Sequence, residues 1–181
     1  MRTFEVPTKE NAPEASKAIF ENLEKQVGMV PNLFATIGYS SNALSNYLTF
    51  QGGQAKGAFN AKEREAVFLA VSQVNDCRYC LAAHTALGKM SGFSEEETLK
   101  LRDGSIEDEK LSVLTQLAAN ITENRGRADE GLVEKFFALG FDNAALIDLV
   151  SLVADKTLAN YVHNLTQVPV DFPEAKELVE A

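Results

Sequence analysis

The stretch that decides the fold reads NAKEREAVFLAVSQV and runs from Asn60 to Val74. Asn60 can cap a helix, and Glu63 stands at the third helical position, so each side chain can bond the backbone N–H of the other residue. The residues that follow are apolar on nearly every side of a helix, which is typical of a helix at the centre of a protein. The pattern therefore predicts a buried helix from Ala61 to Val74.

Helix signals continue on both sides of this run. Before it they predict helices over residues 13–26 and 32–37, and a third helix that Ser41 caps and that runs toward Gly52. After it, Asn75-Asp76 is expected to cap a helix from Cys77 to about Met90. Further helices are predicted over residues 95–101, 107–124, 130–139 and 143–167. With only 5 prolines in 181 residues, the fold class is predicted to be all-α, one compact multi-helix bundle over residues 1–181 with short loops.

Charge and hydropathy exclude two classes of partner. The formal net charge is −9, and such an acidic chain repels the phosphate backbone of a nucleic acid. No apolar run approaches the length needed to span a bilayer, and Met1 to Glu5 lack the apolar core of a signal peptide. We therefore expect a cytoplasmic protein that binds neither nucleic acid nor membrane.

The chain has only two cysteines, Cys77 and Cys80. An isolated close pair in a reducing compartment indicates redox or metal chemistry rather than a disulfide framework. On a helix that starts near Cys77, both cysteines and His84 would lie along one stripe. There the exposed N–H groups and the positive end of the helix dipole favour thiolate over thiol, and His84 can take or relay the proton.

The stretch of residues 60–74 contains two glutamates, and only Glu65 has no structural explanation. Glu63 belongs to the capping box, whereas Glu65 enters an apolar helix, where an unpaired carboxylate costs free energy. A contact with His84 would supply the missing partner, orient the imidazole and raise its basicity. The sequence thus predicts a relay from Glu65 through His84 to a cysteine.

The order of these residues resembles a known superfamily. Glu65 is followed by eleven residues, then CRYCLAAH from Cys77 to His84, then a small-residue helix that ends at Gly92. This spacing is similar to that of the redox members of the alkylhydroperoxidase D-like (AhpD-like) and carboxymuconolactone decarboxylase superfamily, in its peroxidase-related branch. The resemblance extends to residues 30–34, 160–162 and 171–173, and it implies one AhpD-like helical domain with a redox core at about residues 41–124.

The resemblance implies a thiol-dependent peroxidase that reduces hydrogen peroxide or organic hydroperoxides through a dithiol/disulfide cycle. Cys80 would attack the peroxide, Cys77 would resolve the product, and Glu65 and His84 would relay the proton. Tyr79 stands where the best-studied redox members carry a histidine, so it is a further candidate catalytic residue, although it is a poor base near neutral pH. The resemblance also implies an external lipoyl or thioredoxin-like dithiol donor.

Subunit contacts are a further expectation. The predicted helices over residues 61–74 and 143–167 carry more apolar side chains than are needed to fill the core of a small helical bundle, so we expect some of them to contact another subunit. The superfamily commonly forms trimers or hexamers, so the resemblance implies a homo-oligomer.

Three alternatives stay open. Zinc could be held by Cys77, Cys80 and His84, with Glu65 as a possible fourth ligand. Structural zinc sites usually draw a second ligand pair from elsewhere in the chain, however, and the chain offers only His163. We therefore expect neither a metal nor a cofactor. The second alternative is a lactone decarboxylase of the same superfamily, although that branch characteristically lacks the C-x-x-C pair. The third is a non-catalytic thiol switch or scaffold.

Overall fold

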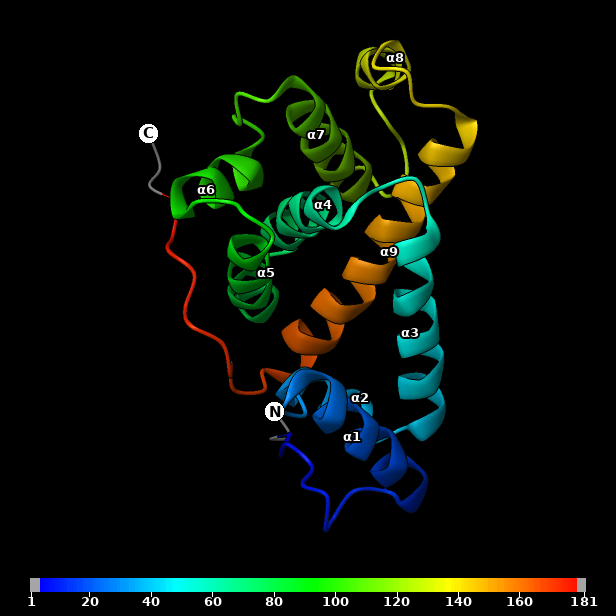
Figure 1. Cartoon of the computed structure of the whole chain (residues 1–181), viewed down its shortest axis with the longest axis vertical. Helices are drawn as coiled ribbons and strands as arrows, with labels where there is room; N and C mark the ends of the chain where they lie inside the picture. Colours follow the sequence, from blue (N-terminus) through cyan, green and yellow to red (C-terminus); the bar gives the residue numbers. More distant parts are fainter. Residues whose placement is uncertain (1–3, 179–181) are drawn as a thin grey trace.

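The computed structural model describes residues 4–178, and every regular element in them is a helix (Figure 1). The elements are α1 (Glu14–Val27), α2 (Asn32–Ile37), α3 (Ser41–Gly53), the short 3-10 helix η1 (Gln54–Lys56), α4 (Ala61–Val74), α5 (Arg78–Met90), α6 (Glu95–Asp103), α7 (Glu109–Glu123), α8 (Glu130–Ala138) and α9 (Asn143–Thr166). The predicted all-α fold class is confirmed. None of the helices in residues 4–178 is both long and apolar enough to cross a bilayer.

Helix α4 lies at the centre of the fold, as predicted. Its capping box is formed: Asn60 Oδ1 accepts the Glu63 N–H at 3.0 Å, and Glu63 Oε2 accepts the Asn60 N–H at 2.9 Å. Every side chain from Ala66 to Ser72 is buried. Four helices, α5, α6, α7 and α9, pack around α4 (Figure 1). The surrounding helices therefore hold α4, and the polar residues on it, in one position.

The buried apolar side chains form three clusters. The first joins α4 to α7, α8 and α9 and contains Phe136 and Leu149. The second lies between α1, α2, α3, α5 and α9 and contains both cysteines. The third lies under α6 and contains Leu101. Since the second cluster encloses Cys77 and Cys80, the dithiol belongs to the hydrophobic core and not to an outer surface.

Helix α9 and the segment after it connect distant parts of the chain. In Figure 1, α9 crosses the molecule obliquely, and it contacts α2, α3, α4, α5 and α7. The segment after α9 is extended and runs past α5 toward α6 (Figure 1). Asp171 of this tail accepts the N–H of Asn32 at 2.7 Å, and the Lys176 carbonyl accepts a bond from Arg102. The tail thereby closes one side of the second cluster.

Two predicted helix caps were wrong by one or two residues. Ser40, and not Ser41, caps α3, because its Oγ accepts the Ala43 N–H. Cys77, and not Asn75-Asp76, caps α5: its sulfur accepts the N–H of Cys80 at 3.4 Å, and the helix begins at Arg78. Ser, Asn and Asp are the usual caps, so the residue type did not indicate a cysteine in this position.

Candidate active site

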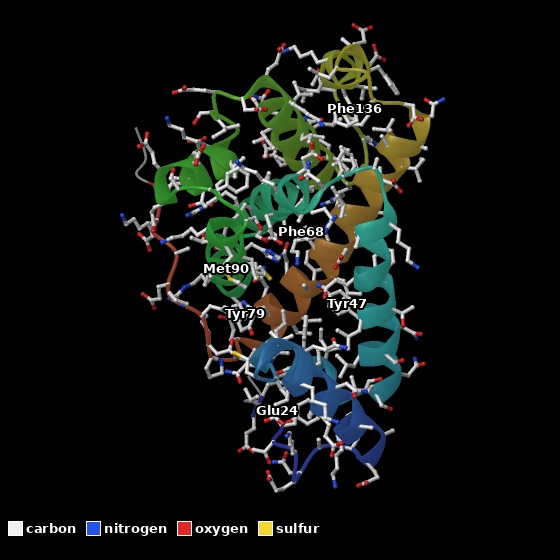
Figure 2. The ribbon with its side chains drawn as sticks, in the orientation of Figure 1. Glu24, Tyr47, Phe68, Tyr79, Met90 and Phe136 are labelled. Atoms are coloured by element: carbon white, nitrogen blue, oxygen red, sulfur yellow. The ribbon has the colours of Figure 1, made fainter. Side chains whose placement is uncertain are left out.

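A cavity of about 770 Å³ lies between α1, α3, α4, α5 and α9. Glu65, Tyr79, Cys80 and His84 line it, whereas Cys77 does not. Its apolar wall includes the aromatic side chains of Phe34, Tyr47, Phe68 and Phe172. In Figure 2, Tyr47, Phe68 and Tyr79 come from three different helices and lie around the middle of the molecule, where α9 crosses. The fold thus brings four of the five predicted site residues to one space.

The two thiols are reduced and differ in environment. Cys80 is 2% exposed and faces the cavity, while Cys77 is 0% exposed and lies behind it. Hydrogen bonding from the Cys77 thiol lowers the pKa of Cys80, with further help from the Lys156 ammonium and against the effect of burial. The pKa of Cys77 is raised, first by its hydrogen bond to Cys80 and then by burial. Cys80 is therefore both the more acidic and the more accessible thiol.

The predicted contact between Glu65 and His84 is confirmed. His84 Nδ1 lies 2.7 Å from Glu65 Oε2, and the two side chains are only 8% and 15% exposed. Burial lowers the pKa of His84, and the Lys156 ammonium adds to this effect, while Glu65 opposes it. The imidazole is consequently neutral near pH 7. With its Nδ1–H donated to Glu65, Nε2 is the nitrogen that can accept a proton.

The second link of the predicted relay is not a direct bond. Within residues 4–178, no hydrogen bond joins His84 to Cys80. Both side chains nevertheless line the same cavity. A molecule bound in that cavity could contact both side chains.

Tyr79 lines the cavity but its hydroxyl is engaged elsewhere. The hydroxyl oxygen accepts the N–H of Leu33 at 3.3 Å, and the ring packs edge-on against Phe172 at 5.7 Å. Burial raises the pKa of Tyr79 well above its ordinary value, and the neighbouring Asp171 carboxylate adds to the rise. A hydroxyl that is held between the start of α2 and the tail, and that resists ionisation, is suited to packing these segments together and not to accepting protons.

Tyr79→Phe is accordingly expected to act on stability more than on chemistry. The change leaves the Leu33 N–H without its acceptor and removes the hydroxyl beside the half-buried Asp171 carboxylate. We therefore expect the free energy of unfolding to fall by about 1–2 kcal/mol. Urea unfolding measures this loss. Turnover under native conditions should fall far less than in a cysteine variant, and a loss as large as that of Cys80→Ser would instead place Tyr79 in the chemistry.

Three polar residues of α9 complete the site and were missed by the sequence reasoning. Asp155, Lys156 and Asn160 are 0%, 2% and 0% exposed. Asn160 accepts a bond from Asn75 Nδ2 at 3.0 Å and donates to Ser72 Oγ at 3.2 Å. Burial raises the pKa of Asp155, against the Lys156 ammonium. The available signal was the one that identified Glu65: Asp155-Lys156 interrupts an apolar helix.

Metal ligands do not converge in the described part of the chain. Within residues 4–178, no three His, Cys, Asp or Glu side chains are arranged to hold one metal ion. His84 directs Nδ1 to Glu65, and Cys77 directs its sulfur to the Cys80 N–H. His84 Nδ1 and the Cys77 sulfur are thus already engaged within the protein.

The segment that contains the site matches a known protein family. Residues 42–123 match the profile of the carboxymuconolactone decarboxylase family. The matched segment contains Glu65, both cysteines and His84, the residues on which the predicted resemblance to this superfamily rests. No curated protein matches the chain.

Solved structures with a similar fold match almost the whole chain. A peroxidase-related protein from Silicibacter sp. TM1040 is 22% identical, with a TM-score of 0.79 over 92% of this chain and 90% of the other. The AhpD core of a peroxidase-related protein from Ralstonia eutropha JMP134 is 19% identical, with a TM-score of 0.79 over 90% and 88%. The debrominase Bmp8, as a Cys-to-Ala variant with 2,3,4-tribromopyrrole, is 14% identical, with a TM-score of 0.78 over 94% and 93%. At these identities the likeness establishes the fold.

Proposed function

We propose that this protein is a member of the carboxymuconolactone decarboxylase family and a thiol-dependent peroxidase for hydrogen peroxide or organic hydroperoxides. One observation carries the proposal: Cys80, the more acidic thiol, shares a cavity with an imidazole that a buried carboxylate holds in place. A nucleophile, a base and a group that orients the base form the arrangement by which proteins activate a nucleophile.

The proposed reaction has three steps. The Cys80 thiolate attacks the terminal oxygen of the hydroperoxide, the O–O bond breaks, and Cys80 becomes a sulfenic acid. His84 takes the thiol proton through the bound peroxide and returns it to the leaving oxygen, which departs as an alcohol or as water. The Cys77 thiol then attacks the sulfenic sulfur, so that water leaves and the Cys77–Cys80 disulfide closes. An external dithiol of lipoyl or thioredoxin-like type reduces this disulfide and is itself oxidised.

We also propose that the protein is a homo-oligomer, a trimer or a hexamer. Large apolar side chains lie exposed along α9: Ile147, Val150, Leu158, Tyr161 and Leu165. Their spacing places them on one stretch of helix surface, and exposed apolar areas of this kind mark protein contacts. The mass of the assembly in solution, measured by light scattering, tests this proposal.

The peroxidase proposal is tested by stoichiometry and by turnover. One equivalent of hydroperoxide should convert the reduced chain to a species lighter by two hydrogen atoms, which intact-mass measurement detects. With excess dihydrolipoamide or reduced thioredoxin, peroxide loss should continue over many cycles. Disulfide formation without such turnover would favour the thiol switch, and the absence of both would overturn the proposal.

Reductive dehalogenation is a second candidate for the same dithiol. The observation that favours it is the aromatic wall of a cavity much larger than hydrogen peroxide needs, on a fold shared with a debrominase. In the balanced reaction, the two thiols would reduce one carbon–bromine bond to a carbon–hydrogen bond. Bromide and a proton would be released, and the thiols would be oxidised to a disulfide. Release of bromide from 2,3,4-tribromopyrrole, measured against the peroxide rate with the same dithiol, decides between the two.

A further inference from the structure

Lys156 places a buried ammonium group in the wall of the cavity. The side chain is 2% exposed, and it comes from the middle of α9, between Asp155 and Thr157. It lines the same space as Cys80 and His84. Within residues 4–178, the ammonium takes part in no ion pair and no hydrogen bond, and its described contact is the face of the Phe68 ring at 4.3 Å.

Such a group is expensive to bury without an anion. The attraction between an ammonium and an aromatic face is smaller than the cost of removing the ammonium from water. The carboxylates nearby do not supply the difference. Glu65 is bonded to His84, and in the described residues no ion pair joins Lys156 to Asp155, the residue before it in the chain.

The charges around the cavity also favour an anionic ligand. Arg64 and Lys156 are positive, and Glu65 is the one carboxylate among the lining residues. Arg64 is committed to the Phe59 carbonyl at 2.7 Å. Lys156 is thus the cation of the cavity wall for which the described residues show neither an ion pair nor a hydrogen bond.

We propose that Lys156 binds the anionic end of the substrate, and that the substrate is an apolar carboxylic acid that carries a hydroperoxide group. The acid end pairs with the ammonium, the apolar body lies against the aromatic wall, and the hydroperoxide reaches Cys80 in the same cavity. The hydroperoxide part rests on the proposed function. The carboxylate part rests on the buried, unpaired cation alone.

The main competing role for Lys156 is that of counter-ion to the Cys80 thiolate. In that role the ammonium would speed the attack on every hydroperoxide alike. As a carboxylate-binding group it distinguishes an acid from its neutral ester. The two roles therefore predict different results for one pair of substrates.

Equilibrium binding tests the site without any turnover. Decanoate and decanol are titrated calorimetrically into the reduced wild-type protein, into Lys156→Met and into the control Lys62→Met, whose lysine also lies over a phenylalanine ring, Phe93, but does not line the cavity. We expect Lys156→Met to bind decanoate about 10- to 100-fold more weakly, the range of a charged hydrogen bond, with decanol unchanged. Equal decanoate binding by the folded variant would overturn the proposal.

Kinetics provide a second test, which begins with the wild-type protein. A fatty-acid hydroperoxide should show a kcat/KM about 10- to 100-fold above that of its methyl ester, mostly through KM. Equal values for acid and ester would overturn the carboxylate site while leaving the peroxidase intact. If neither compound is consumed but decanoate still binds through Lys156, the peroxidase proposal fails and the site stands. A parallel loss on acid and ester in Lys156→Met would assign the counter-ion role instead.

Discussion

Cys80→Ser is expected to stop peroxide consumption, with a rate loss of about 1000-fold or more. The serine hydroxyl is not ionised near pH 7, and the acidic thiol that faces the cavity is the nucleophile of the proposed reaction. Stopped-flow measurement of hydroperoxide loss, with excess dithiol donor, gives the rate. The fold should persist, because the exchange of sulfur for oxygen changes the volume of the side chain little.

Cys77→Ser is the matched control for this variant. Cys77 lies behind Cys80 and caps α5 through the Cys80 N–H, a role that a serine oxygen also fills. The first equivalent of peroxide should therefore still be consumed, after which the Cys80 sulfenic acid accumulates and can be trapped by a dimedone reagent. Loss of the first equivalent in Cys77→Ser, with its retention in Cys80→Ser, would exchange the two roles. Unchanged turnover in both variants would contradict the peroxidase proposal.

Glu65→Gln and His84→Gln are each expected to lower kcat/KM for hydroperoxide by about 100-fold, the lower range of general acid–base catalysis. The bond of 2.7 Å between His84 Nδ1 and Glu65 Oε2 orients the imidazole, and the neutral ring is the base of the proposed reaction. Glutamine is close in size to both side chains and can neither accept nor release a proton near pH 7. Circular dichroism and urea unfolding should show that both variants fold, and wild-type rates in either would remove that residue from the relay.

The pH dependence of kcat/KM for hydroperoxide tests the direction of the pKa shifts of Cys80 and His84. Because the pKa of Cys80 is lowered, the rate should rise with pH and reach its plateau at a lower pH than an ordinary cysteine would allow. Because the pKa of His84 is also lowered, the imidazole should stay unprotonated through the neutral range, and its loss as a base should come only at more acidic pH. Glu65 raises the pKa of His84, so Glu65→Gln should move that acidic limb lower still. A limb that moves to higher pH would contradict this assignment.

Sequence patterns were sufficient to predict the features that depend on residues close together in the chain. The capping box at Asn60 and Glu63, and the apolar residues after it, specify α4 because helix capping and burial follow from residue type and the helical period. The pair Glu65 and His84 could be predicted because a buried carboxylate needs a partner. The cysteine cap of α5 could not, since cysteine is not among the residues that capping statistics favour.

The sequence by itself determined the helical fold class, the dithiol, and the carboxylate and imidazole that meet at 2.7 Å. Only the tertiary structure decided which thiol faces the cavity, because α1, α3 and α9 enclose Cys80 on one side and leave Cys77 behind it. It also decided that the Tyr79 hydroxyl meets Leu33 and the tail, and that Lys156 of α9 stands in the wall of the cavity. These contacts join residues about fifty to ninety positions apart, and helical periodicity specifies which side chains share a face of one helix but not which distant helix that face will meet.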